Sequence, residues 1–502
     1  MKLREICEEM ECILIQGDMD KEVTDIAYDS RKAVPGSVFV CITGTETDGH
    51  LYIRDAVEKG ASAIIVEREE EAEMIPECIT VIKVYSGRRA LALISSVYFG
   101  HPERDLITVG ITGTKGKTTT MYMIKSILDA AGERAGISGT IEIMTGSRKI
   151  YAYNTTPQSY ELYKYMAEMV KSGCRYIIME VSSQGIKMNR TEGIIFDYGV
   201  FTNISPDHIG PGEHEDFGEY LMCKSLLFRQ CVTGVVNADD VYIDDILKEH
   251  TCSVITFSAE KKADITASDV RPFKENGRLG MEFEFSGLMK GPGKVNIPGR
   301  FSVYNALAAA AVCRSMGISE TDVQKGLEEV HVKGRAEMVN ISEDFTVIID
   351  YAHNETSTRS ILETLRSYRP SRIVAVFGCG GNRSRIRRYD IGRIAGELAD
   401  LSVLTSDNPR FEKVSDINDD IKKTLNETGG DYLEIEDRKE AIAYAVTHAF
   451  PGDVIIMLGK GHEDYIETEG IRYHFSEHEA IEEIVKEIKS GERRMENGAK
   501  LI

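Results

Sequence analysis

The chain has 502 residues, of which 42% are apolar and 28% charged, and a formal net charge of −21. That length exceeds what one hydrophobic core usually supports, so two to four domains are expected. The acidic balance argues against a protein that binds nucleic acid over a broad basic face, although a few Lys and Arg residues in one cleft can still bind small anions.

The cysteines and the N-terminal segment favour a cytoplasmic protein. The ten cysteines form no Cys-x-x-Cys pair, which argues against a zinc ribbon or a redox motif and is typical of a reducing compartment. The segment MKLREICEEMECILIQG lacks a signal-peptide core, and no apolar run reaches membrane-spanning length. We expect a monomer with neither membrane nor nucleic-acid partners.

Residues 1–100 alternate short apolar runs with helical patterns, which predicts a first α/β domain. Strands are predicted over SVFVCI (37–42), ASAIIVE (61–67) and ITVIKVY (79–85), and helices over HLYIRDAVEKG (50–60) and RRALALISSVYFG (88–100). The segment HPERD at 101–105 breaks the pattern and predicts a linker.

Residues 101–333 are predicted to form a second α/β domain. Its buried strands are DLITVGI (105–111), RYIIMEV (175–181), YGVFTNI (198–204), TGVVNA (233–238) and SVITFS (253–258). Because such runs alternate with helices, we expect a mostly parallel sheet covered on both faces. A β-rich insertion is expected over 264–297, followed by a helix over 304–317.

Residues 334–492 are predicted to form a third α/β domain. Its strands are FTVIID (345–350), RIVAVFG (372–378), LSVLTS (401–406) and DVIIMLG (453–459), and its helices include SILETLRSY (360–368), DRKEAIAYAVTHAF (437–450) and EAIEEIVKEIKSG (479–491). The tail at 493–502 is predicted to be disordered.

The segment GITGTKGKTTT (110–120) predicts a phosphate-binding loop, because it lies between a buried strand and a helix. A strict P-loop motif requires glycine at 111, where this chain has Ile111 and a glycine one residue earlier. Lys117 would contact the β- and γ-phosphates of a nucleotide, and the Thr118 hydroxyl would ligate Mg²⁺. The alternative is a glycine-rich turn without a ligand.

Three further residues lie where a nucleotide site would need them. Glu180 ends a predicted strand beside the loop and is a candidate Mg²⁺ ligand, although a helix-capping or solvated acid is equally typical of that place. His208 follows the next strand and is a candidate second metal ligand, although a lone histidine there is more often structural. Lys224 lies among apolar neighbours, where a long cation usually extends to solvent.

Together these segments resemble the Mur ligase family, ATP-dependent enzymes that form amide bonds in peptidoglycan synthesis. DSRKAVPGSVFVCITGTETDGHLYI (29–53) resembles the family's uridine-binding segment, and the loop at 110–120 resembles its ATP loop, glycine spacing included. The resemblance extends over nearly the whole chain. It implies a three-domain α/β architecture, with a central P-loop-type parallel sheet and a Rossmann-like C-terminal domain.

The resemblance also implies the roles of individual residues. The residues implied to bind ATP are Gly113, Thr114, Gly116, Lys117, Thr118, Thr119, Asn305, Arg335 and Asp350. Those implied to bind the UDP-linked substrate are Ser30, Arg31, Thr155, Thr156, Ser182 and Arg190. Those implied to bind the amino acid are Arg383, Asp407, Asn408, Arg410, Gly459 and Glu463.

The metal and catalytic residues follow from the same resemblance. Mg²⁺ would be held by Thr118, Glu180, His208 and Lys224. Lys224 matches the family's carbamoylated lysine, whose carbamate would turn a buried cation into an anion beside the metal. Lys117, His208 and Lys224 are the implied catalytic residues.

The implied reaction adds meso-diaminopimelate to UDP-MurNAc-L-Ala-D-Glu through an acyl phosphate in the cytoplasm. The DNPR form of one motif (407–410) favours diaminopimelate over L-lysine, because Arg383 and Arg410 can fork onto a carboxylate while Glu463 receives an ammonium.

Departures from the family pattern leave alternatives open. Gln184 stands where histidine is usual and Pro206 where arginine is usual, and the segments ETSTRS (355–360) and RSRIRRYDIG (383–392) are atypical. The alternatives are a ligase for another amino acid or acceptor, a relative of folylpolyglutamate synthetase, and a P-loop NTPase that acts as a switch. The uridine-like segment argues against the folylpolyglutamate type.

Overall fold

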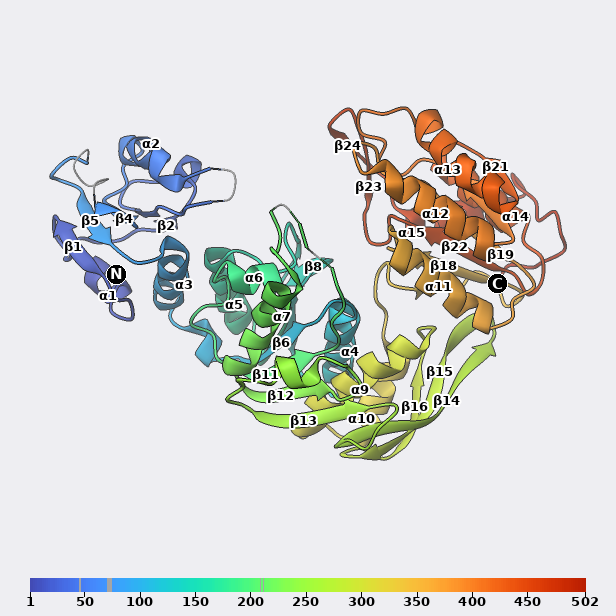
Figure 1. Cartoon of the computed structure of the whole chain (residues 1–502), viewed down its shortest axis with the longest axis horizontal. Coiled ribbons are helices and arrows are strands. Elements are labelled where there is room, and N and C mark those ends of the chain that lie inside the picture. The colour runs from blue at the N-terminus through green and yellow to red at the C-terminus, as the bar shows by residue number, and fades with distance from the viewer. Residues whose placement is uncertain (45–46, 70–74, 208, 211) are drawn as a thin grey trace. The chain divides into compact units, whose positions relative to one another are not determined.

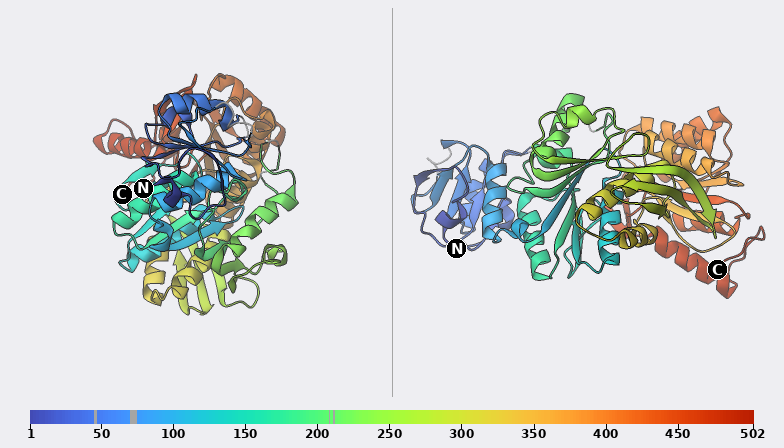
Figure 2. Two further views of the ribbon diagram at one scale, coloured as in Figure 1. Left: turned by 90° about the vertical axis from the view of Figure 1, so that its left-hand side faces the viewer. Right: turned by 90° about the horizontal axis from the view of Figure 1, so that it is seen from below.

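The computed structural model describes the chain except for residues 45–46, 70–74, 208 and 211. The chain divides into two compact units, one formed by residues 1–265 and 308–323 and the other by 266–307 and 324–502. Figure 1 shows the elements of each unit, and Figure 2 shows them from two further directions. No helix in the described part of the chain is long and apolar enough to cross a membrane.

The first unit begins with a small sheet in the order β1-β5-β4-β3-β2. Strands β2 to β5 pair in parallel, whereas β1 pairs with β5 in the antiparallel sense. The elements are α1 (Leu3–Ile6), β1 (Ile13–Gln16), β2 (Ile26–Ala27), β3 (Val38–Val40), α2 (Ile53–Glu58), β4 (Ala63–Val66), β5 (Thr80–Lys83) and α3 (Gly87–Tyr98). The three predicted strands are confirmed, and the helix expected at 50–60 is split into a 3₁₀ turn and α2.

The first unit also contains the central sheet, whose strands follow the order β13-β12-β11-β6-β10-β7-β8-β9 within an 11-stranded sheet. Strands β8 and β9 pair in the antiparallel sense. Strand β6 lies between β10 and β11 and is parallel to both. The strands are β6 (Ile107–Thr112), β7 (Ala135–Ser138), β8 (Glu142–Met144), β9 (Lys149–Tyr151), β10 (Tyr176–Glu180), β11 (Phe196–Phe201), β12 (Cys231–Asn237) and β13 (Ser253–Ser258). The helices are α4 (Lys117–Ala130), α5 (Ser159–Lys171), α6 (Ser183–Lys187), α7 (Phe217–Ser225) and α8 (Ile243–Ile246).

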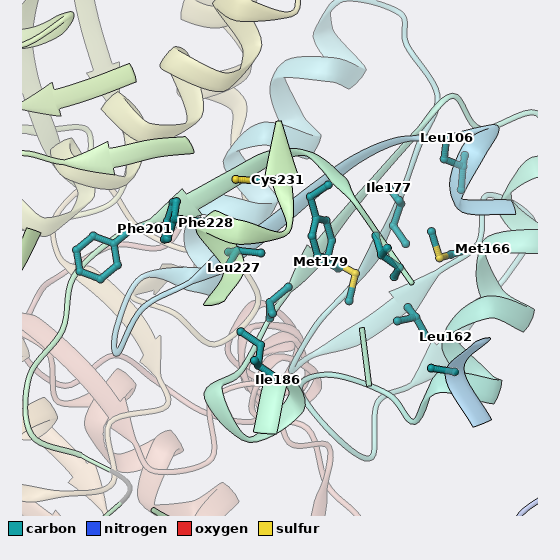
Figure 3. Close-up of a cluster of buried hydrophobic side chains, with 14 of the residues drawn as sticks. Leu106, Leu162, Met166, Ile177, Met179, Ile186, Phe201, Leu227, Phe228 and Cys231 are labelled. Atoms are coloured by element: carbon teal, nitrogen blue, oxygen red, sulfur yellow. The ribbon is translucent and has the colours of Figure 1, made fainter. Parts of the chain in front are cut away.

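The expectation of a buried, mostly parallel sheet is confirmed, because every residue of β10 is buried and its neighbours run parallel to it. A large apolar cluster covers these strands, as Figure 3 shows for Ile177 and Met179 of β10 and for residues of the packed helices. In the same cluster the rings of Phe201 and Phe228 meet edge to face with centroids 6.5 Å apart. The sheet therefore gives a rigid base to the loops at its carboxyl edge.

The second unit contains the predicted β-rich insertion and a further α/β sheet. The insertion consists of β14 (Ile265–Glu275), β15 (Arg278–Gly287) and β16 (Gly291–Val295). Helices α9 (Arg300–Ser315) and α10 (Glu320–Glu329) follow in the sequence, and the division between the units falls within each of them. The α/β sheet has the order β17-β18-β22-β19-β20-β21. Its strands β18, β22, β19, β20 and β21 are all parallel to their neighbours in this series.

The remaining elements of the second unit alternate strand and helix. They are β17 (Glu337–Met338), β18 (Thr346–Asp350), α11 (Glu355–Ser367), β19 (Ile373–Phe377), α12 (Arg385–Leu398), β20 (Leu401–Leu404), α13 (Val414–Thr428), β21 (Tyr432–Glu434), α14 (Arg438–Thr447), β22 (Val454–Leu458), β23 (Tyr465–Thr468), β24 (Ile471–His474) and α15 (Glu477–Ser490). Side-chain caps start several helices, for example Asn354 before α11 and Ser476 before α15.

The C-terminal tail differs from the expected disorder. Arg493 forms ion pairs with Glu440 and Glu487, and Ala499 is buried in the apolar cluster of the second unit. The Ile502 amide also donates to the Ile341 carbonyl at 2.9 Å. Composition suggested a solvated tail, but Met495, Ala499 and Leu501 pack in the apolar cluster of this unit and Arg493 is paired with two glutamates.

Candidate active site

The phosphate loop is shorter than its glycine spacing suggests. Gly110 lies within β6, where a Cβ atom would come within 3.0 Å of the Phe196 ring. The loop begins only at Gly113, whose φ is +146°, and ends at Gly116, whose φ of +87° precedes α4. Gly110 is thus a packing residue of the strand, and Ile111 is a buried residue of the same strand rather than part of the loop.

The end of β11 fixes the loop. The Thr114 amide donates to the Asn203 carbonyl at 2.8 Å, and the Lys115 amide donates to the Asn203 side chain at 3.0 Å. Lys117 donates to the carbonyls of Gly113 at 2.8 Å and Thr114 at 3.2 Å. The Lys117 ammonium therefore lies over the loop itself, at the amino end of α4, where backbone amides favour a phosphate.

We expect Gly113→Ala to unfold the loop. A Cβ atom at this position would lie 2.0 Å from the Thr202 hydroxyl oxygen, in a backbone conformation that alanine rarely adopts. Strain and overpacking together should lower the free energy of unfolding by about 3 kcal/mol. Gly132→Ala is the matched control, because Gly132 also has a positive φ but open space around it, and it should cost only about 1 kcal/mol. Equal losses in urea unfolding would contradict this account.

Glu180 lies at the carboxyl end of β10, directly beside Ile111 of β6. Its buried carboxylate accepts hydrogen bonds from the Thr118 hydroxyl at 3.0 Å and from the Thr140 amide at 2.8 Å, and its second oxygen accepts from the Thr140 hydroxyl at 3.1 Å. A carboxylate and a hydroxyl side by side are the hard oxygen ligands that Mg²⁺ prefers. The pair predicted from sequence, Thr118 and Glu180, is therefore adjacent in space.

Lys224 lies inside the same region and does not extend to solvent. The residue is 1% exposed, and its ammonium donates to the Gly113 carbonyl at 2.9 Å and lies 4.4 Å from the centroid of the Tyr220 ring. Lys117 donates to the same carbonyl oxygen. Burial lowers the pKa of Lys224 well below its usual value, and the positive charge of Lys117 lowers that pKa further.

A cavity of about 210 Å³ lies beside Lys117 and Lys224. Residues that line it are Lys117, Ser182, Ser183, Gln184, Gly212, Glu213, His214, Tyr220 and Lys224. His214 was not predicted as a site residue, although it is buried and its Nε2 lies 2.9 Å from the Ser183 hydroxyl. Predicted ligand His208 lies outside the described residues. Within the described part of the chain, no three acidic, His or Cys side chains gather as a metal site.

Four of the residues expected to bind the UDP-linked substrate form one hydrogen-bonded group. The Thr155 hydroxyl lies 3.1 Å from that of Thr140, and the Thr156 hydroxyl donates to the Glu180 carbonyl at 2.9 Å and lies 3.1 Å from the Ser182 hydroxyl. Arg190 donates to the Thr156 carbonyl at 2.8 Å. Hydrogen bonds therefore connect this group to Glu180, the candidate metal ligand.

The other two residues of that set lie apart from this group. Ser30 is buried at the start of a 3₁₀ turn, Ser30–Lys32. The Arg31 side chain is 85% exposed, and its guanidinium bonds to both carboxylate oxygens of Asp29. No contact between Ser30 or Arg31 and the Thr156 group is found among the described residues.

In the second unit, Asp350 and Arg335 lie close together. The Asp350 carboxylate accepts hydrogen bonds from the amides of Ala336 at 2.6 Å and Ala352 at 2.8 Å. Burial raises the pKa of Asp350, while the charge of Arg335 opposes that rise. The Arg335 guanidinium lies 4.6 Å from the centroid of the Tyr351 ring. Asn305, predicted to bind ATP, is buried in α9.

All six residues expected to bind the amino acid line one cavity of about 320 Å³ in the second unit. Glu463 accepts a hydrogen bond from the Asn408 amide group at 2.9 Å and lies 3.7 Å from the buried Lys460 ammonium. Burial raises the pKa of Glu463, whereas Lys460 lowers it. Arg410 has a φ of +53° and donates to the Gly381 carbonyl at 2.8 Å, which holds its guanidinium at the cavity.

Sequence reasoning missed several residues of this cavity. Tyr351, His353 and Arg387 also line it, and the Tyr351 hydroxyl donates to Glu463 at 3.4 Å. The segment DYAHN offered a signal, because it directly follows β18 and the carboxyl ends of parallel strands commonly hold ligands. Arg387 gave no such signal, since it lies within the atypical segment 383–392.

Comparisons with known proteins agree with the arrangement. The chain matches family models described as "Mur ligase family, catalytic domain" over residues 22–99, "Mur ligase middle domain" over 111–313 and "Mur ligase, glutamate ligase domain" over 334–461. It is 41% identical to a UDP-N-acetylmuramoyl-L-alanyl-D-glutamate–2,6-diaminopimelate ligase of Clostridium tetani, over 97% of this chain and all of that protein. It is 39% identical to the enzyme of the same name from Clostridium perfringens, over 97% of this chain and 100% of the relative.

Two solved structures illustrate the fold. A UDP-N-acetylmuramoyl-L-alanyl-D-glutamate–2,6-diaminopimelate ligase matches with a TM-score of 0.70 at 24% identity, covering 98% of this chain and 99% of that one. A folylpolyglutamate synthase of Mycobacterium tuberculosis matches with a TM-score of 0.58 at 18% identity, but covers only 74% of this chain and 92% of its own. The three-domain α/β architecture expected from the sequence is therefore confirmed.

Proposed function

Because the chain belongs to the Mur ligase family, whose members are ATP-dependent ligases, we propose that it joins meso-diaminopimelate to UDP-MurNAc-L-Ala-D-Glu. The observation that carries this proposal is the second unit's cavity, where Arg383 and Arg410 face the same space as Glu463. We further propose that the protein acts as a monomer in the cytoplasm, with domain boundaries near residues 100 and 333.

The loop region fits a bound Mg²⁺. The Thr118 hydroxyl and the Glu180 carboxylate, 3.0 Å apart, would hold it, and a carbamate on Lys224 together with His208 would hold a second ion. When bound, Mg²⁺ neutralises negative charge on the phosphates that react. The carbamate is consistent with the surroundings of Lys224, because two ammonium groups share the Gly113 carbonyl, and an anion at Lys224 would replace repulsion with attraction.

The proposed reaction has two steps. The terminal carboxylate of the UDP-linked acceptor attacks the γ-phosphorus of ATP, ADP leaves, and an acyl phosphate forms. The amine of diaminopimelate then attacks the acyl carbon, phosphate leaves, and the amide remains. Phosphoryl transfer of this kind depends on positioning and on charge neutralisation, which Lys117 and the amides at the start of α4 supply on the side of ATP.

The amino-acid cavity supplies selectivity. The distal end of meso-diaminopimelate carries both a carboxylate and an ammonium, whereas that of lysine carries only the ammonium. Arg410 and Arg383 would fork onto the carboxylate, and Glu463 would receive the ammonium. Lysine has no distal carboxylate for the two guanidiniums, of which Arg410 already lies 3.7 Å from Glu467, so it would lack the charge-assisted hydrogen bonds that diaminopimelate can form. The charges of the cavity therefore favour a zwitterionic side chain.

An amino-acid panel tests this proposal. Purified protein with ATP and UDP-MurNAc-L-Ala-D-Glu should release ADP with meso-diaminopimelate at a kcat/KM at least about 1,000-fold above that with L-lysine or L-ornithine. Phosphate release should require both the acceptor and the amino acid. A preference for lysine would sink the diaminopimelate assignment, and ATP hydrolysis without acceptor would favour an NTPase switch.

Variants of the cavity sharpen the same test. Arg410→Lys should raise the KM for meso-diaminopimelate about 10- to 100-fold, because lysine cannot form a fork, while the KM for ATP should stay unchanged. Arg393→Lys is a matched control, because Arg393 belongs to α12 but does not line the cavity. Equal effects of the two substitutions would show that Arg410 does not select the amino acid.

A further inference from the structure

Two arginines of the first unit lie near each other without a carboxylate partner. Arg88 is in the first turn of α3, and Arg190 follows α6. Within the described residues, neither forms an ion pair; Arg88 donates to the Thr43 carbonyl at 3.2 Å and Arg190 to the Thr156 carbonyl at 2.8 Å. The Arg190 Nε is buried and has no hydrogen-bond partner there.

A neighbouring ion pair brings the two arginines together. Arg89 Nε lies 2.8 Å from a carboxylate oxygen of Glu192, which joins the start of α3 to the turn that carries Arg190. Arg88 directly precedes Arg89 in the sequence, and Arg190 lies two residues before Glu192. Burial lowers the pKa of Arg190, and the positive charge of Arg88 lowers it further. Glu192 thus neutralises the charge of Arg89, whereas the positive charges of Arg88 and Arg190 repel each other.

Glu67 is the carboxylate that most affects Arg88, and it is already engaged. Its two oxygens accept hydrogen bonds from the Gly87 amide and from the Thr43 hydroxyl, both at 2.7 Å. The Glu67 charge raises the pKa of Arg88, but burial outweighs it and the pKa of Arg88 stays lowered. A pair of partly buried guanidiniums without an internal anion is the arrangement that phosphate groups recognise.

The backbone partners of Arg88 and Arg190 indicate which phosphate groups the two arginines would bind. Arg88 bonds to Thr43, in the segment 29–53 that resembles a uridine-binding segment. Arg190 bonds to Thr156, in the group with Ser182 that we expect to hold the muramoyl peptide. In a UDP-linked sugar, the diphosphate lies between the uridine and the sugar that carries the peptide. We propose that Arg88 and Arg190 together bind the diphosphate of the UDP-linked substrate, an assignment of Arg88 that rests on the proposed function.

This assignment separates Arg88 from Arg31. Arg31 is exposed and holds Asp29 with a bidentate pair, so a phosphate would have to displace a carboxylate there. Arg88 has no such competitor among the described residues. The charge that meets the diphosphate from α3 is therefore that of Arg88.

Steady-state kinetics and direct binding test the assignment. Arg88→Ala should raise the KM for UDP-MurNAc-L-Ala-D-Glu and the Kd for UDP about 10- to 100-fold. The kcat and the KM for ATP should change less than about threefold, because phosphoryl transfer takes place elsewhere. Arg88→Lys, which keeps the charge but loses the fork, should give an intermediate KM. Arg88→Gln provides the same measurement with a neutral side chain of similar length if the alanine variant unfolds.

Arg89→Ala is the matched control, since Arg89 occupies the same helical turn but has a carboxylate partner. It should leave the KM for the UDP-linked substrate and the Kd for UDP near their wild-type values, because the Arg89 guanidinium is exposed and already paired with Glu192. The assignment is overturned if Arg88 variants keep the wild-type Kd for UDP, or if Arg89→Ala weakens UDP binding as much as Arg88→Ala does. Calorimetry with UDP needs no ligase reaction, so an inactive wild-type protein that binds UDP through Arg88 would refute the proposed function while supporting this inference.

Discussion

Replacing Lys117 with alanine is expected to lower kcat about 1,000-fold, or about 4 kcal/mol of transition-state stabilisation. The Lys117 ammonium lies over the loop and donates to the carbonyls of Gly113 and Thr114. From there it can turn to the γ-phosphate, whose charge must be offset when an anionic carboxylate attacks. The release of ADP in single-turnover experiments with saturating substrates measures this effect.

Lys115 is the matched control for Lys117. It is two residues away in the same loop, but its ammonium is half exposed and lies 3.8 Å from Asp207. Lys115→Ala should therefore keep kcat within about threefold of the wild type, since an exposed ion pair contributes little. If the two alanine variants lost activity equally, the effect would come from the conformation of the loop and not from the charge at Lys117.

The strands and the loop were predictable because their signals are local. Runs such as RYIIMEV contain mostly β-branched and apolar residues, and β10 is buried along its whole length. Thr118 and Glu180 are adjacent because the carboxyl ends of parallel strands meet at one edge, a rule that needs no knowledge of side-chain contacts. The motif and the periodicity together thus predicted the strands, the loop and the neighbouring positions of Thr118 and Glu180.

Other features depend on tertiary contacts that no local pattern encodes. Gly110 counted as part of the loop by spacing, but it packs against Phe196, which is far away in sequence. His214 lines the cavity beside Ser183, which is 31 residues earlier in the sequence. The tail is ordered because Ser342 and Asp344 bind Lys500, a contact across the length of the second unit's sequence. Long-range pairs of this kind explain each of the differences.

The two lysines of the first unit have different environments and different expected chemistry. Lys117 lies at the start of α4, where we propose that it binds a phosphate and where a cation needs no modification. Lys224 is buried beside it, shares the Gly113 carbonyl, and faces an aromatic ring. Burial lowers the pKa of Lys224, so its amine is more often neutral, and a neutral amine is the form that adds carbon dioxide. The structure thus favours modification at Lys224 and not at Lys117.

Lys224→Ala is expected to lower kcat about 1,000-fold, because the variant would lose the anion that helps to hold the second Mg²⁺. Added acetate or formate should restore part of the activity by occupying the space of the carbamate. Lys224→Arg is the informative control: it keeps a cation in the same place but cannot form a carbamate, so it should be as inactive as the alanine variant and should not respond to carboxylates.

The carbamate on Lys224 can also be tested directly in the wild-type protein. Labelled bicarbonate should give a carbamate signal in magnetic resonance spectra of the wild type, and that signal should be absent in Lys224→Ala and retained in Lys117→Ala. Near-normal turnover of Lys224→Ala, or an active Lys224→Arg variant, would rule out the carbamate. An active Lys224→Arg variant would mean that a cation at residue 224 is sufficient, and an active Lys224→Ala variant would mean that no charge is needed there. In either case the lowered pKa of Lys224 would reflect burial against Tyr220 and repulsion by Lys117 alone.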